Sequence, residues 1–87
     1  MKLKKCGIGD KGVRHLTRAK FWPNLVELDL RENPISGAGA RELLAAEVPR
    51  DLTALVLPAD GLDGAAKAAL RRRFGDAVVF SEGERPV

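Results

Sequence analysis

The chain has 87 residues, of which 45% are hydrophobic and 31% charged, and a formal net charge of +3. This length allows one small domain, and the composition excludes an intrinsically disordered chain. No stretch reaches the roughly 20 consecutive apolar residues of a membrane-spanning helix. The first residues lack the apolar core of a secretory signal, and the single cysteine cannot form an internal disulfide. We therefore expect a cytoplasmic protein with no membrane partner.

Charge is distributed unevenly along the chain. Residues 1–20 hold seven basic groups against Asp10 alone, a net charge of +6, whereas residues 21–66 carry −5 and residues 67–87 carry +2. A basic end beside an acidic middle can attract nucleic acid. It also arises when successive parts of one fold, or two subunits, attract each other. We expect charge complementarity within the fold or between subunits, and nucleic-acid binding remains an alternative.

The stretch 25–44 carries the strongest pattern. Its apolar positions and one asparagine follow the order Leu-x-x-Leu-x-Leu-x-x-Asn-x-Ile, and residues 38–46 then change to helical spacing. The same frame recurs 27 residues later and, in shortened form, 27 residues earlier. Its members are Leu25, Leu28, Leu30, Asn33 and Ile35, then Leu52, Leu55, Leu57, Asp60 and Leu62, and before both Met1, Leu3, Cys6 and Ile8.

The first unit covers residues 1–24. Its predicted elements are a strand near 1–4 and a helix near 10–19. Asp10 is expected to cap this helix, because a carboxylate there accepts a hydrogen bond from an unpaired amide. Cys6 occupies the asparagine column of the frame. Phe21 is expected in the core, whereas the sequence leaves the exposure of Trp22 open.

The second unit, residues 25–51, is the complete one. Its predicted elements are a strand near 27–31 and a helix near 37–47. The side chain of Asn33 is expected to lie inside the turn and to bond main-chain groups, since an amide both donates and accepts hydrogen bonds.

The third unit, residues 52–80, departs from the frame in ways that suggest the end of a repeat array. Its predicted elements are strands near 54–57 and 77–80 and a helix near 64–73. Asp60 replaces asparagine in the turn, and Lys67 stands where the earlier helices have an apolar residue. Alternation turns Val78 and Phe80 inward. Residues 81–87 are polar and are expected to form a flexible tail.

Frame, period and helix pattern together resemble the leucine-rich repeats of the ribonuclease-inhibitor type, over residues 1–80. The ending 70–80 also looks like the closing segment of bacterial proteins with such repeats. The resemblance implies an α/β fold, a right-handed solenoid of about three repeats near 1–24, 25–51 and 52–80. Parallel strands would lie on its concave side and helices on its convex side. It also implies protein binding as the usual activity, with no catalytic residue and no cofactor.

No pattern in the chain predicts a reaction. A nucleophile pair would need Cys6 and His15, but His15 falls on the outer helix face. The same two residues cannot supply the ligands of a zinc site. Gly7, Gly9 and Gly12 have the spacing of a dinucleotide fingerprint, yet the preceding segment is too short for the strand that this motif requires. We expect no enzyme activity, no metal and no cofactor.

The expected function is binding of a protein partner through the concave sheet face. In one alternative the chain only caps a longer repeat array, and in another its basic N-terminal segment binds nucleic acid. The open N-terminal end is expected to meet preceding repeats or to self-associate. Asp29 is expected to pair with Lys2 on the next strand, and Arg31 is expected to lie unneutralised beside Lys4. The candidate contact residues are Lys2, Lys4, Glu27, Asp29, Arg31 and Val56, with Trp22 at the rim as an anchor if exposed.

Overall fold

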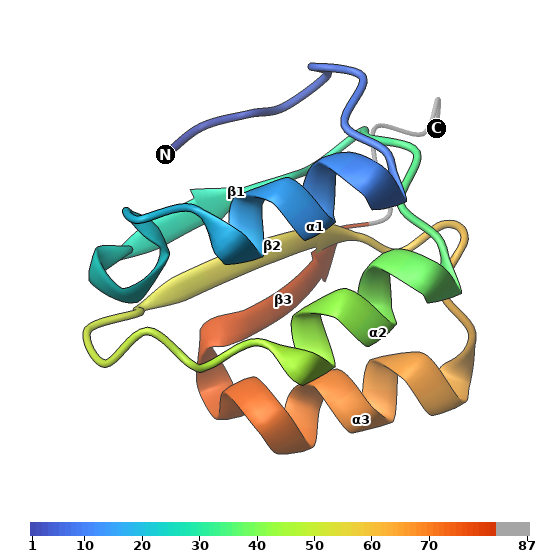
Figure 1. Cartoon of the computed structure of the whole chain (residues 1–87). Helices are drawn as coiled ribbons and strands as arrows, with labels where there is room; N and C mark the ends of the chain where they lie inside the picture. Colours follow the sequence, from blue (N-terminus) through green and yellow to red (C-terminus); the bar gives the residue numbers. More distant parts are fainter. Residues whose placement is uncertain (82–87) are drawn as a thin grey trace.

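A computed structural model describes residues 1–81 of the chain. Three parallel strands alternate with three α-helices, as predicted (Figure 1). In chain order the elements are α1 (Asp10–Arg18), the 3₁₀ turn η1 (Trp22–Asn24), β1 (Glu27–Asp29), α2 (Gly37–Ala45), β2 (Ala54–Pro58), α3 (Gly64–Phe74), the 3₁₀ turn η2 (Gly75–Ala77) and β3 (Val78–Ser81).

The strands lie in the order β1, β2, β3, so each strand pairs with the next one along the chain. The register places Leu28 opposite Leu55 and Leu55 opposite Val78, all of them buried. At the free edge of β1 the N-terminal residues of the chain run parallel to this strand. A β-bridge pairs Lys2 with Asp29, and the amide of Leu3 donates a hydrogen bond to the Asp29 carbonyl at 2.8 Å. The expected strand near 1–4 is thus present as a short parallel pairing.

The three helices cover one face of the sheet and leave the other face open (Figure 1). α1 packs against α2, and α2 packs against α3, so the helices form a second layer in chain order. The core lies between the layers, and eight of its fourteen buried residues are leucines, six of them at the frame positions. Its most deeply buried members are Val13, Trp22, Leu28, Leu30, Ile35, Leu43, Leu55, Leu57 and Leu70.

The 27-residue frame of the sequence is repeated in the backbone. Lys5 and Glu32 stand 27 residues apart, and both have left-handed backbone angles, with φ of 55° and 56°. This conformation is uncommon for residues with a Cβ atom. Its recurrence at matching positions indicates the same turn in two successive units.

Asn33 holds these two turns together. Its side-chain oxygen accepts hydrogen bonds from the amides of Cys6 and Ile8, at 3.0 and 2.9 Å. Its side-chain nitrogen donates to the carbonyls of Leu3, Leu30 and Arg31 at 2.8, 3.0 and 3.1 Å. The predicted role of this asparagine is confirmed, and its reach extends into the preceding unit.

The predicted cap of α1 is wrong. The residue before the helix is Gly9, and no side chain caps it. Asp10 is instead the first residue of α1, and its carboxylate turns to the start of α2. There it accepts hydrogen bonds from the Ser36 amide at 2.7 Å, the Gly39 amide at 2.9 Å and the Ser36 hydroxyl. The first unit therefore caps the helix of the second.

The expectation for Phe21 is also wrong, because this ring is 40% exposed and its neighbour Trp22 fills the core with 1% exposure. The indole nitrogen of Trp22 donates to the Glu47 carbonyl at 2.8 Å, so the buried ring has its hydrogen bond. The turn η1 rotates one aromatic ring inward and the other outward. Sequence alternation does not determine this rotation.

The C-terminal end shows one further difference. Ser81, which is expected in the tail, is instead the last residue of β3. The rest of the expected tail, residues 82–87, lies outside the described residues. Phe80 is partly buried, with Arg71 and Lys67 over its ring at 5.0 and 5.9 Å from the centroid. None of the helices within residues 1–81 has the length and apolar character needed to cross a membrane.

Candidate binding surface on the open sheet face

The open sheet face is the face of the sheet opposite the three helices. A row of side chains crosses it, because alternate residues of a strand point to the same side. Pairing of neighbouring strands joins Lys2 to Asp29, Asp29 to Val56, and Val56 to Val79. We call these four residues the central row. It is charged at the N-terminal edge of the sheet and apolar at the C-terminal edge.

Asp29 does not form the expected pair with Lys2. It is 6% exposed and binds Arg31, two residues further along the same strand face, with distances of 2.8 to 3.1 Å between the guanidinium nitrogens and the carboxylate oxygens. The hydrogen bonds from the Arg31 side chain hold the pKa of Asp29 below its ordinary value, although burial acts in the opposite direction. Asp29 is therefore a buried, paired carboxylate, and it is not an accessible contact residue.

The expected repulsion between Arg31 and Lys4 is also removed. The Lys4 ammonium lies 3.3 Å from a carboxylate oxygen of Glu32, and Lys5 lies 3.9 Å from the other oxygen. Lys4 is thus neutralised by Glu32, and Arg31 is neutralised by Asp29, so both acids come from the second unit. The presence of the two cations is explained by contacts within the fold, so it gives no evidence for an acidic partner at this place.

The apolar half of the central row consists of Val56, which is partly exposed, and Val79, which is 52% exposed. Val79 was absent from the predicted set. The alternation that turns Val78 and Phe80 inward also turns Val79 outward, so the signal was present in the sequence. An exposed valine pair beside a charged edge is suited to contact with a surface that is both apolar and charged.

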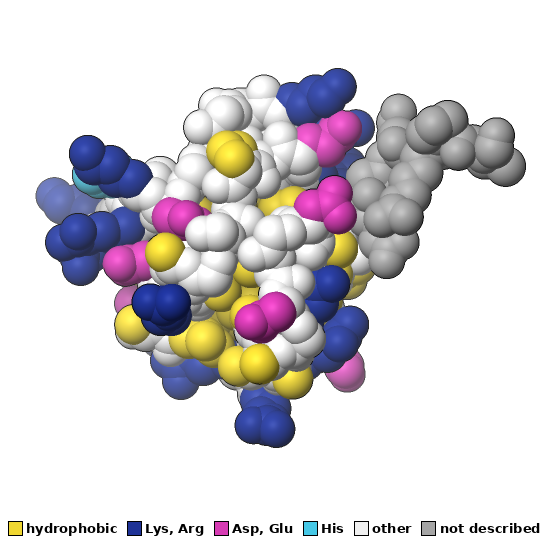
Figure 2. Space-filling view, turned by 90° about the vertical axis from the view of Figure 1, so that its right-hand side faces the viewer, with side chains coloured by type: hydrophobic (Ala, Val, Ile, Leu, Met, Phe, Trp, Pro, Cys, Tyr) yellow, Lys and Arg dark blue, Asp and Glu magenta, His cyan; other side chains and the backbone are white. Residues whose placement is uncertain are grey.

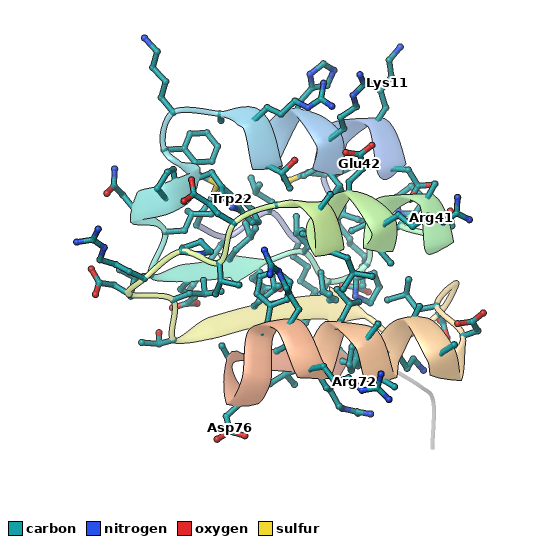
Figure 3. All side chains as sticks on the ribbon, turned by 60° about the horizontal axis from the view of Figure 1, so that its bottom comes forward. Lys11, Trp22, Arg41, Glu42, Arg72 and Asp76 are labelled. Atoms are coloured by element: carbon teal, nitrogen blue, oxygen red, sulfur yellow. The ribbon has the colours of Figure 1, made fainter. Side chains whose placement is uncertain are left out.

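The remaining candidates lie apart from this row. Glu27 is exposed at the start of β1, in register with Ala54. Trp22 is buried within the core (Figure 3), so it offers no anchoring contact to a partner. The predicted set therefore loses Trp22 as an accessible residue.

The described residues that could act as nucleophile, base or metal ligand do not come together in one site. Cys6 is exposed in the first turn, and His15 is exposed on α1. Among the described residues no hydrogen bond joins them. Over residues 1–81 no three His, Cys, Asp or Glu side chains come together as metal ligands.

Residues 23–44 match the family model described as Leucine Rich repeat. They cover the end of η1, all of β1, the Asn33 turn and most of α2. The strand, the turn and the helix are the parts that the 27-residue frame repeats. No curated protein and no solved structure matches the chain. The match covers 22 of the 87 residues, which are similar to one leucine-rich repeat, and the parallel sheet with its helices gives the described residues an α/β fold of the kind that such repeats build.

Proposed function

We propose that the chain is a protein-interaction module that binds its partner across the open sheet face. The observation that carries the proposal is the central row. Val79 and Val56 expose apolar surface on rigid strands, and Lys2 gives the other end of the row an exposed charge. Leucine-rich repeats commonly bind proteins in this way, so the family match supports the same conclusion.

The finer architecture belongs to this proposal. Units with a strand, a turn and a full α-helix favour the ribonuclease-inhibitor type of repeat, stacked as a solenoid with the open sheet face on its concave side. The capping alternative, in which these units only terminate a longer array, is favoured by one observation. Lys67 and Arg71 cover Phe80 at the C-terminal edge, and cations suit the solvent-facing side of a final repeat.

Site-specific photocrosslinking tests the proposed surface. A photoreactive amino acid replaces Val79 in one variant and Val48 in another, because both valines are exposed while only Val79 lies in the central row. Partners crosslinked at each position are identified by mass spectrometry. We expect one protein to be crosslinked through position 79 and not through position 48.

The affinity for that protein is then measured with Val79→Arg and Val48→Arg. Introducing a charged side chain at the centre of an apolar contact is expected to weaken binding at least about tenfold, whereas the change at position 48 leaves it unaltered. Equal crosslinking at both positions, or binding that survives Val79→Arg, would remove the open sheet face from consideration. The capping alternative predicts no saturable partner at position 79.

A further inference from the structure

The outer side of α1 carries an unusual concentration of positive charge. Lys11, Arg14, His15 and Arg18 follow the spacing i, i+3, i+4 and i+7, which places them along one face of the helix, and all four are exposed. We call these four residues the basic stripe. Basic side chains gather on the left of Figure 2 with the histidine among them, and in Figure 3 Lys11 points away from α2.

Helix formation does not account for the whole basic stripe. Arg18 lies in the last turn, where the helix dipole favours a cation. Like charges three and four residues apart nevertheless destabilise a helix, and Lys11 lies in the first turn, where the dipole favours an acid. Within residues 1–81 no carboxylate lies within ion-pair distance of Lys11, Arg14 or Arg18. This distinguishes them from Lys4 and Arg31, whose charges acids of the fold neutralise.

The repeat frame does not require basic residues at these positions either. The same four positions in α2 and α3 are mostly alanine, with one arginine in each helix and one glutamate in α2. Those residues are Ala38, Arg41, Glu42 and Ala45 in α2, and Ala65, Ala68, Ala69 and Arg72 in α3. The charge is therefore particular to the first unit, and neither stacking of the helices nor burial accounts for it.

The surroundings of the basic stripe indicate what would bind there. A groove of about 310 Å³ separates the last turns of α1 and α2, and Arg18 shares it with Glu42 and Glu47. Glu42 points from α2 toward α1 (Figure 3). Three residues beyond Arg18, the exposed ring of Phe21 adds apolar surface.

This mixture of groups favours a polypeptide over a nucleic acid. A phosphate backbone is negative along its whole length, so it would meet the carboxylates of Glu42 and Glu47 directly beside Arg18. A polypeptide can place acids on the basic stripe, other residues in the groove and an apolar side chain on Phe21. Nothing on this surface provides the series of stacking aromatics found in single-strand binders.

We infer that the basic stripe of α1 docks an acidic segment of a partner polypeptide, with Phe21 as the apolar contact at its end. The site lies on the helical layer, so it is separate from the open sheet face. The two surfaces are independent, and the failure of one proposal leaves the other standing.

The first experiment titrates the whole ¹⁵N-labelled chain with a peptide probe. The probe is a peptide of about 16 residues whose glutamates recur at the spacing i, i+3, i+4 and i+7, with one leucine near its end. We expect saturable binding at low salt, with chemical-shift changes concentrated in residues 10–21. Shift changes centred on the open sheet face, or a response that does not saturate, would overturn the inference.

The second experiment uses two charge-reversal variants with the same change in net charge. Arg14→Glu with Arg18→Glu alters the basic stripe, whereas Arg41→Glu with Arg72→Glu alters the equivalent positions of α2 and α3. All four arginines are exposed, so both variants are expected to fold. The first pair should weaken peptide binding at least about tenfold and the second less than about twofold. An equal loss in both would show attraction by net charge alone and would overturn the site.

Two further measurements identify other occupants. A single-stranded oligonucleotide of about 12 thymidines that binds residues 10–21 more tightly than the peptide would replace the polypeptide by a nucleic acid and contradict the inference. A dilution series of the protein alone tests for a second copy. Shifts of α1 amides that depend on protein concentration would show self-association at this face, and their absence is expected.

Discussion

At the scale of the residue, Asn33 concentrates more of the fold's hydrogen bonding than any other described side chain. It is 6% exposed and makes five hydrogen bonds to the main chain, three of which reach the first unit. A buried donor or acceptor that loses its partner costs about 1 to 3 kcal/mol. The asparagine is therefore expected to hold the first two units in register.

We expect Asn33→Ala to lower the free energy of unfolding by about 2 to 4 kcal/mol, because one buried and four part-buried hydrogen bonds are lost at once. Urea unfolding followed by circular dichroism measures the change. Asp60→Ala is the matched control, since Asp60 occupies the same column of the frame but is exposed. A loss below about 0.5 kcal/mol for both variants would show that water replaces the asparagine without cost.

Asp10 gives the stability of the protein a defined dependence on pH. The Ser36 hydroxyl, followed by the Ser36 amide, lowers the pKa of Asp10 below its ordinary value of 3.8. A carboxyl group with a lowered pKa in the folded state contributes stability that is fully present above its unfolded pKa. This stability is lost as pH falls from there through the folded pKa.

The variant Asp10→Asn should therefore be less stable than the wild type at about pH 7 and about pH 5 by the same amount, and the difference should shrink below about pH 3.8. Unfolding in urea at several pH values measures it. Asp51→Asn serves as the control, because Asp51 is exposed in the loop before β2. A difference that grows as the solution is acidified would contradict the assigned role of the carboxylate.

At the scale of the element, the start of α2 depends on a glycine. A Cβ atom on Gly39 would lie 2.5 Å from a carboxylate oxygen of Asp10 and 2.7 Å from the Ile35 side chain. Neither approach is possible without displacement. The cap that Asp10 provides therefore requires glycine at this position of the second helix.

Gly39→Ala is expected to destabilise the protein by about 1 to 3 kcal/mol through this crowding. Gly37→Ala is the control. It meets open space at the first residue of the same helix and should be neutral or stabilising by up to about 1 kcal/mol. Thermal unfolding of both variants, and of Gly39→Ala combined with Asp10→Ala, separates the two contacts. If Gly39→Ala costs as much stability in the Asp10→Ala background as in the wild type, the added Cβ atom is crowded by Ile35 alone.

The sequence predicts the helices, the strands and their parallel order, because apolar spacing and the 27-residue frame are local signals. It does not predict contacts whose partner is specified only by stacking. The spacing predicts Asp10 as a local cap, whereas its carboxylate accepts hydrogen bonds across the interface between two units. It predicts a partner for Asp29 on the next strand, whereas the partner is Arg31 in the turn that follows β1. The orientation of Phe21 and Trp22 follows from the turn η1, which no periodicity describes.

At the scale of the whole molecule, both ends of the helical layer are basic. α1 carries the basic stripe, and the last turn of α3 carries Arg71, Arg72 and Arg73. Head-to-tail stacking of two copies would bring these ends together, so repulsion opposes it at low ionic strength. Screening by salt should weaken this repulsion, because the Debye length falls to about 3 Å at 1 M.

Sedimentation velocity should therefore show a monomer at about 50 mM salt and greater association at about 500 mM. Arg72→Glu leaves the Arg71 contact with Phe80 and the Arg73 bond to the Ala46 carbonyl in place, and it should raise association at low salt. Association of the wild type that is strongest at low salt would mean that opposite charges attract the copies. That result would contradict the predicted repulsion between the ends.

The two ways of capping a helix give the molecule a mechanical polarity. Asp63 caps α3 from within its own unit, at 2.7 Å from the Ala66 amide, whereas α2 receives its cap from Asp10 of the unit before. Under force applied at the N-terminal end, removal of the first unit takes the cap from α2, so two units should detach in one step. That step releases about 50 residues and lengthens the chain by roughly 170 Å. Under force from the C-terminal end, the third unit can detach alone and leave the Asp10 cap of α2 in place.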